Sequence, residues 1–313
     1  PINPLYFNWD IEDKLAPKIE YLQVNYLDDK ELKRGGIKLA LEKNGNSYKP
    51  SKPVIKIPAW RAGLAVYVRD LMTGVSNKNG IYKSQLYVDD SLQFEFKMDS
   101  ISFDYYRNLN GHIDYYHYQQ SKHRLHKLYK QPGNHLPIYS KNKEAVIKLY
   151  ENKARQIRIE ISDYHQNTSV VEFDMLRDTS MEVYNNIQFQ YYLEQGKAHI
   201  INKDQVKIKF PEDCLYEDMY LEILEVQEKE KGYASSVIHI GDTDIAVQGY
   251  YDLFIKHNIK DSSLWEKACI VYCEDKKYIN FGGKILDNLI GTQVPQLGSY
   301  VVFIDTVPPE ITP

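Results

Sequence analysis

Residues that could recognise a ligand are concentrated between positions 104 and 116. This stretch is dense in acids, amides, arginine and aromatic rings. Seven side chains are candidate binding residues: Tyr105, Arg107, Asn110, His112, Asp114, Tyr115 and Tyr116. Tyrosine has a flat apolar face and a polar tip, so the stretch could bind a sugar or a peptide. The alternative is a buried hydrogen-bond network that holds this segment on the core, because unpaired polar groups there would be costly.

Histidine is the next residue type to consider, because imidazole is a common metal ligand. Five of the nine histidines lie close together in the sequence: His112, His117, His123, His126 and His135. His123 and His126 are three residues apart, a spacing that could place both on one metal ion. No cysteine, glutamate or aspartate completes that set, and the alternative is a polar helix face. His257 and Asp261 are four apart, but no further histidine follows them. We therefore predict no metal ligands and no catalytic residues in this chain.

Two acidic turns are weaker candidates for a cation site. Residues 163–167 and 241–244 place carboxylates and an amide between predicted strands. Oxygen ligands of this kind bind Ca²⁺, although turns use the same residues without an ion. The sequence contains no nucleophile turn of the Gly-x-Ser-x-Gly type, no phosphate loop and no dinucleotide-binding fingerprint.

Length and composition limit the classes of protein to which this chain can belong. At 313 residues it exceeds one ordinary core, so we expect two domains. A net charge of −4 argues against a nucleic-acid partner. No apolar run is long enough to cross a bilayer. Cys269 and Cys273 would lie about 13 Å apart on one strand, beyond disulfide reach. With Cys214 they are expected to be free thiols.

The elements that must position these residues are predicted to be β-strands. The chain has 27 tyrosines, and tyrosine favours pleated, half-buried surfaces. Residues 18–27 alternate apolar and polar side chains, the pattern of a half-buried strand. Residues 81–88 and 92–98 alternate in the same way around Asp89 and Asp90, which predicts a hairpin. Similar runs predict further strands at residues 53–57, 62–69, 135–139, 145–149, 156–162, 169–175, 205–210, 220–226, 250–255, 268–272 and 299–304.

One segment interrupts the strand pattern. Side chains recur every three or four residues at Tyr115, Tyr118, Lys122, Leu125 and Tyr129, which predicts a helix over residues 115–130.

The fold class expected from these patterns is mainly β, with two antiparallel β-sandwich (Ig-like) domains. The expected organisation is a lead-in at 1–12, a sandwich at 13–176 with a helical insertion at 104–130, a second sandwich at 177–305, and a tail or the start of a further module at 306–313.

Several motifs resemble, in order, the region that follows the catalytic domain of lysostaphin-type zinc endopeptidases from Bacteroidetes-type bacteria. These enzymes cut peptidoglycan cross-bridges. The opening PINPL at residues 1–5 is similar to the segment just after their final His-x-His strand. The remaining motifs are residues 79–82 (NGIY), 96–104 (FKMDSISFD), 110–115 (NGHIDY), 132–134 (PGN), 163–168 (DYHQNT), 210–218 (FPEDCLYED) and 298–309 (GSYVVFIDTVPP).

One departure from this family decides what can be carried over. Its zinc ligands follow a His-x-x-x-Asp motif and a later His-x-His motif, and this chain contains no His-x-His. Three protein ligands and an open position are needed for zinc catalysis, so no catalytic residue is transferred. The resemblance implies that zinc belongs to a catalytic domain upstream of Pro1 and that this chain has no cofactor of its own.

The resemblance implies a non-catalytic accessory region of a peptidoglycan endopeptidase, which positions or docks its upstream catalytic domain. The expected location is the periplasm or outer-membrane-associated cell envelope of a Gram-negative bacterium. One alternative is a module that binds peptidoglycan or peptide through the 104–130 insertion. Another is a scaffold subunit of an outer-membrane assembly, derived from an inactive peptidase. Partners would then be peptidoglycan or another envelope protein, with no membrane span.

Overall fold

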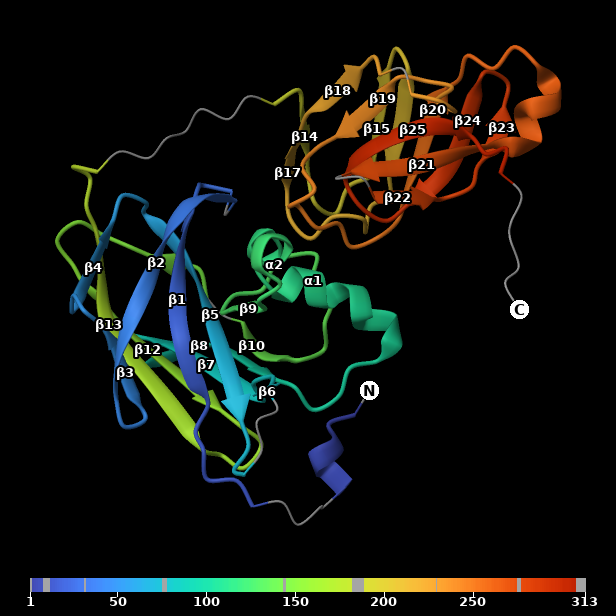
Figure 1. Cartoon of the computed structure of the whole chain (residues 1–313). Helices are drawn as coiled ribbons and strands as arrows, with labels where there is room; N and C mark the ends of the chain where they lie inside the picture. Colours follow the sequence, from blue (N-terminus) through green and yellow to red (C-terminus); the bar gives the residue numbers. More distant parts are fainter. Residues whose placement is uncertain are drawn as a thin grey trace. The chain divides into compact units, whose positions relative to one another are not determined.

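The protein is built mainly from β-strands, in two units (Figure 1). The structure, a computed structural model, describes residues 2–7, 12–30, 32–74, 78–142, 145–181, 189–228, 230–274 and 277–307. The chain divides into Pro1–Ile187 and Gln188–Pro313. Each unit has its own buried core, as expected for a chain of this length.

The first unit is a β-sandwich in which one long strand serves both sheets. Its described strands are β1 (Lys18–Leu27), β2 (Lys33–Asn44), β3 (Ser47–Pro50), β4 (Val54–Ile57), β5 (Arg61–Leu71), β6 (Lys78–Asn79), β7 (Lys83–Val88), β8 (Ser91–Lys97), β9 (Leu125–Lys127), β10 (Tyr139–Asn142), β11 (Ile147–Lys148), β12 (Arg155–Ser162) and β13 (Thr168–Arg177). The first part of β2 pairs with β1, and its last four residues pair with β3. The strand order is β10-β8-β7-β12-β13-β3-β2-β1-β5-β11. Pairing is antiparallel except where β13 runs parallel to β3 and β4.

The core of this unit lies between the two sheets. Alternate side chains of β1 and β5, such as Leu22 and Leu64, meet side chains of β7, β8 and β12, such as Phe94 and Ile159. All four are fully buried. Residues 18–27 form a strand as predicted, but it is buried on both faces: Leu22 faces the core between the sheets, whereas Tyr21 packs with Leu125 in a second buried cluster.

The predicted hairpin is present between β7 and β8. Asp89 and Asp90 have φ values of 50° and 60°. Two successive residues with positive φ form the tight turn whose twist matches that of the paired strands, and aspartate tolerates this conformation.

Strand β2 was not predicted. Its sequence, KRGGIKLALEKN, has two glycines and few β-branched residues, and Leu39 is its buried apolar residue. Only pairing with β1 and β3 makes this segment a strand, because its own residues favour helix or turn.

Gly36 in β2 allows the close approach of β1. A Cβ atom there would overlap the backbone carbonyl oxygen of Val24 and lie 3.3 Å from the Cα of Asn25. We expect Gly36→Ala to lower the free energy of unfolding of this unit by about 2 kcal/mol, because backbone atoms must move to make room. Gly80→Ala is the matched control, since a Cβ there meets nothing within 4 Å. Urea unfolding of both variants checks the prediction, and equal stabilities would contradict it.

The insertion differs from the predicted long helix. It contains a 3₁₀ turn, η2 (Phe103–Asn108), and two short helices, α1 (Leu109–His112) and α2 (Tyr115–Ser121). The prediction of helix through residue 130 was wrong beyond Ser121. Residues 125–127 instead form β9, which pairs with β5. Leu125 is buried against Tyr21 and Ala65, so pairing and burial on the sheet overrode the helical spacing. Figure 1 shows the helices and β9 beside β5 and β10.

The end of the first unit also differs from the sequence expectation. Strand β13 continues to Arg177, and the Asp178 N–H donates to the Ile57 carbonyl at 2.8 Å. The stretch predicted to begin the second domain therefore still pairs with the first.

The second unit is a separate β-sandwich. One five-stranded sheet contains β15 (His199–Lys203), β16 (Val206–Phe210), β20 (Tyr251–Lys256), β24 (Leu289–Val294) and β23 (Lys284–Leu286). The other contains β18 (Ile223–Val226), β19 (Val237–Ile240), β25 (Gly298–Ile304), β21 (Ala268–Glu274) and β22 (Lys277–Asn280). Strands β14 (Tyr191–Leu193) and β17 (Met219–Leu221) pair separately. Residues of both five-stranded sheets share one core.

Three smaller observations complete the fold. The remaining helical turns are η1 (Pro4–Phe7) and η3 (Ser262–Lys267). In the described part of the chain, no helix has the length and apolar character needed to cross a bilayer. Cys269 and Cys273 both lie on β21, and they and Cys214 are free thiols.

Candidate functional site

The helical insertion is fixed to the first sandwich through Asp114. This residue caps α2, because its carboxylate accepts the His117 N–H at 3.1 Å. Its other oxygen accepts a hydrogen bond from Lys33 Nζ at 2.7 Å. Burial alone would raise the pKa of Asp114, but the Lys33 ammonium, together with the Lys127 charge and the His117 N–H, holds the pKa below its usual value. Asp114 is thus a positioning residue for the insertion.

His112 and His126 form a buried pair at the centre of the insertion. His112 Nε2 lies 3.0 Å from His126 Nδ1, and His112 Nδ1 lies 3.0 Å from the Tyr139 hydroxyl. The edge of His112 also meets the Phe96 ring at 4.6 Å. One imidazole nitrogen must donate and the other accept, so the bond requires that at least the accepting ring is neutral.

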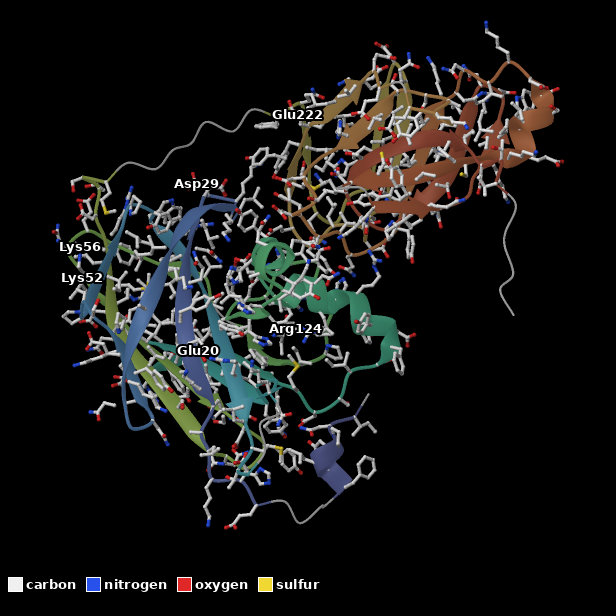
Figure 2. The ribbon with its side chains drawn as sticks, viewed as in Figure 1. Glu20, Asp29, Lys52, Lys56, Arg124 and Glu222 are labelled. Atoms are coloured by element: carbon white, nitrogen blue, oxygen red, sulfur yellow. The ribbon has the colours of Figure 1, made fainter. Side chains whose placement is uncertain are left out.

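Burial keeps both rings neutral near pH 7. It lowers the pKa of His112 well below 6.5, with the charges of His126 and Lys127 adding to the effect. It lowers the pKa of His126 to about 4, with Arg124 adding to it. Arg124, labelled in Figure 2, lies just before β9 and is exposed.

Asparagine side chains extend this network to the segment after β9. Asn134 Nδ2 donates to the Asn108 carbonyl at 3.2 Å and to the Tyr139 hydroxyl at 3.1 Å. Asn108 Oδ1 in turn accepts the His135 N–H at 3.0 Å. For His112 and Asp114 the structure therefore agrees with a buried network and not with direct ligand contact.

The outer surface of the insertion is aromatic. Tyr105 and Tyr116, two of the predicted binding residues, are exposed. Phe103 and Tyr106 are more exposed, at 79% and 65%, and were not predicted. We refer to Phe103, Tyr105, Tyr106 and Tyr116 as the aromatic face. The three aromatic residues at positions 103, 105 and 106 indicate such a surface in the sequence, but the sequence does not tell which of them face solvent.

The other predicted binding residues lie between these two environments. Arg107, Asn110 and Tyr115 are half-buried. The Tyr115 ring lies 6.5 Å from that of Tyr118. They can support the aromatic face but do not form its outermost layer.

The clustered histidines do not converge on a metal site. His117 Nε2 lies 2.6 Å from the Tyr21 hydroxyl, and His123 stacks on Tyr67 at 4.6 Å. His126 is on β9 and not on a helix with His123, so the proposed spacing does not apply. The expectation that His123 and His126 share one helix was therefore wrong.

Two further candidate sites, His257 with Asp261 and residues 241–244, form hydrogen bonds within turns. Asp261 caps η3 by accepting the Ser263 N–H at 2.9 Å, and His257 Nδ1 accepts the Ile259 N–H at 3.2 Å. In residues 241–244, Asp242 accepts the Asp244 N–H at 3.3 Å.

A different group of side chains has the spacing of metal ligands. Asp13, Asp163 and His165 each offer one atom, and these atoms all lie within 4.8 Å of one another. Among the described residues, these three form the one group of at least three histidine, cysteine, aspartate or glutamate side chains close enough together to hold a metal ion. The 163–167 turn was considered from the sequence, but Asp13 comes from a segment 150 positions earlier, which local spacing cannot reveal.

The N-terminal segment is tied to the first sandwich. Ile2 forms a β-bridge with Ser100, and the Asn3 N–H donates to the Asp99 carbonyl at 2.9 Å. The Tyr6 hydroxyl donates to Asp99 Oδ1 at 2.5 Å.

The same carboxylate is held by the sandwich itself. The Tyr82 hydroxyl donates to Asp99 at 2.6 Å, and Lys97 Nζ lies 3.0 Å from its other oxygen. Tyr164 meets the rings of Tyr6 and Tyr82 edge-on. Residues 2–7 are thus attached beside the end of β8.

Comparison with known proteins bears on the second unit. Residues 190–305 match the model of a Zu5-like domain. The match lies within the unit Gln188–Pro313 and covers less than half of the chain, so it describes that sandwich and leaves the first unit unassigned. The search of curated proteins found no match. The resemblance to the tail of a zinc endopeptidase stays a prediction.

Proposed function

We propose that this chain is a non-catalytic accessory region of a cell-envelope peptidoglycan endopeptidase, located in the periplasm or at the outer membrane. It positions or docks a catalytic domain that precedes it, and zinc belongs to that domain. The ordered motifs and the missing His-x-His sequence support this proposal. The observation that carries it is the attachment of residues 2–7 at Asp99.

This attachment is suited to positioning. A flexible linker would leave an upstream domain free to rotate, whereas backbone and side-chain bonds at Ile2, Asn3 and Tyr6 fix the direction of the chain. Four polar groups contact the carboxylate or the backbone carbonyl of Asp99: two from residues 2–7 and two, Tyr82 and Lys97, from the sandwich. Residues 2–7 therefore bind to a carboxylate that the sandwich already holds in place.

The first experiment asks whether this chain has hydrolytic activity. The zinc-loaded chain is incubated with purified peptidoglycan, and released fragments are separated by chromatography. We expect no release above the buffer control, because the described residues hold no His-rich zinc site of the family's type. Turnover comparable to that of a complete endopeptidase would defeat the proposal. The reading frame upstream of Pro1 adds a second result: intact zinc ligands there favour an enzyme, and decayed ligands favour a scaffold.

A second function, binding of peptidoglycan, is favoured by the aromatic face. Exposed aromatic rings stack on sugar rings and peptide planes at little cost in conformational entropy. Four such rings on one short insertion, two of them more than half exposed on a single 3₁₀ turn, are unusual for a purely solvated surface.

Retention on insoluble peptidoglycan tests this second function. We expect the chain to be retained and Tyr106→Ser or Tyr116→Ser to weaken binding about tenfold, the effect of losing one aromatic contact. Tyr278→Ser is the matched control, since Tyr278 is equally exposed but lies on β22 in the second unit. No retention, or equal losses for all three variants, would leave positioning as the function.

A further inference from the structure

Three separate segments of the first unit bring acidic side chains to one place. Asp13 precedes β1, Asp70 is near the end of β5, and Asp163 begins the turn between β12 and β13. His165 lies in the same turn. Tertiary pairing of the sandwich is needed to assemble this group, which we call the acidic cluster (Asp13, Asp70, Asp163 and His165).

The carboxylates of this cluster are buried together without a matching positive charge. Asp13, Asp70 and Asp163 are each less than 9% exposed. Among the described residues, none of the ion pairs of this unit includes them, and His165 is the basic side chain beside Asp163. Like charges that are buried and unpaired are costly, so something must compensate them.

Asp70 provides independent evidence for a missing partner. It is 6% exposed, and its Oδ1 atom accepts no hydrogen bond from the described residues. Nearly all buried polar atoms have a partner, and an orphaned carboxylate oxygen calls for an explanation such as a bound ion. Burial, followed by the charges of Asp163 and Asp13, raises the pKa of Asp70 to about 7. The Asp163 and Asp13 carboxylates therefore lie near enough to act on Asp70, which is adjacent to the three side chains whose ligand atoms lie within 4.8 Å of one another and is not one of them.

The rest of the cluster is held in place by the surrounding backbone. Asp13 Oδ1 accepts the N–H groups of Leu15 and Thr73 and the Thr73 hydroxyl, each at 3.0 Å. All of these bonds fall on Oδ1, so Oδ2 is left for a ligand.

Asn167 orients the two sides of the cluster at once. Its backbone N–H and side-chain Nδ2 donate to the two oxygens of Asp163 at 2.9 and 2.7 Å. The same Nδ2 donates to the Asp13 carbonyl at 3.0 Å. Second partners of this kind hold metal ligands in position before an ion binds.

We propose that Asp13, Asp163 and His165 bind a divalent cation, with Oδ1 of Asp70, the oxygen that accepts no hydrogen bond from the described residues, as a further ligand. Carboxylates alone suit Ca²⁺ and Mg²⁺, whereas an imidazole nitrogen suits transition metals. The mixed set therefore selects Mn²⁺ or Zn²⁺. Such an ion would join the segment before β1 to the ends of β5 and β12.

The experiment uses the full chain after dialysis against EDTA. Mn²⁺ and Zn²⁺ binding is followed by calorimetry, Mn²⁺ binding also by electron paramagnetic resonance, and thermal unfolding is measured with and without each ion. We expect about one Mn²⁺ to bind, with an increase in the unfolding temperature. His165→Ala and Asp163→Asn should each weaken binding at least about tenfold.

Asp70→Asn gives the sharpest result, because its two effects have opposite signs. Without metal the variant should be more heat-stable than the wild type, since one unpaired buried charge is removed. Its affinity for Mn²⁺ should nevertheless fall at least about tenfold. A residue with a purely structural role would not combine greater stability without metal with weaker binding. This variant also keeps the test decisive if Asp163→Asn fails to fold.

Matched controls separate this cluster from chance binding at other side chains. Glu172→Gln changes an exposed acid on β13, and His135→Ala removes an exposed histidine. Both should bind Mn²⁺ like the wild type. The proposal is overturned if neither Mn²⁺ nor Zn²⁺ binds below about 1 mM, the weak end of protein cation sites. It is also overturned if Asp70→Asn binds unchanged, or if Ca²⁺ alone binds and His165→Ala has no effect.

Discussion

His112→Ala is expected to lower the free energy of unfolding of the first unit by about 3 kcal/mol. The substitution leaves a cavity beside Phe96, where the imidazole edge now packs. It also removes a hydrogen-bond partner from both His126 and Tyr139. His126 is buried, so its orphaned nitrogen carries the full desolvation cost.

Urea unfolding followed by hydrogen exchange and mass spectrometry checks this, because peptides of the two units are read separately. Peptides from β5, β8 and β9 should lose protection at lower urea, while those from β21 and β25 should not change. His135→Ala is the control, since that side chain is exposed and its backbone makes the contact with Asn108. A destabilisation by His112→Ala below about 1 kcal/mol would contradict a central role for the pair.

The second large effect is a loss of stability of the first unit in mild acid. His126 has a pKa of about 4 in the folded chain, against a usual 6.5, and the pKa of His112 is lowered as well. As pH falls below 6.5 the unfolded chain therefore binds protons that the folded chain cannot. Stability is complete above about pH 6.5 and falls as pH drops towards 4, by up to about 1.4 kcal/mol per pH unit for each imidazole. Protonation of both rings would also set two N–H groups against each other across their hydrogen bond.

The measurement is the free energy of urea unfolding of this unit at pH 7.5, 6 and 5, made in EDTA. It is best made in the Asp70→Asn background, because the raised pKa of Asp70 takes up a proton in the folded state and opposes the histidines. His126→Gln in that background should flatten the pH dependence. Identical slopes with and without His126 would show that the pair does not control the acid response.

Much of the fold could be predicted because its strands carry their own signal. The alternation at 18–27 and the Asp89–Asp90 turn contain enough local information to define an element. Strands β2 and β9 do not contain such local information. Gly36 and Leu125 are in strands because a neighbouring strand offers its free backbone groups, and that information lies elsewhere in the chain.

The same distinction explains the candidate site. Residue types at 104–116 indicated a polar and aromatic cluster. In the structure, His112 and Asp114 of this cluster are buried, whereas Tyr105 and Tyr116 are exposed. The acidic cluster was not predicted for a different reason, which is the distance along the chain between its members. Asp13 and Asp163 meet only after the sandwich closes, and no spacing in the sequence records their proximity.

The parallel pairing of β13 has a consequence for how the protein is made. Residues 47–57 have their β13 partner at residues 168–177, so these early strands emerge from the ribosome long before that partner does. Closing so long a loop is slow, and until then the edges of β3 and β4 that pair with β13 have no partner strand. A nascent chain that ends before β13 should therefore be a substrate for chaperones, and release of the first sandwich as a folded body should await synthesis of β13.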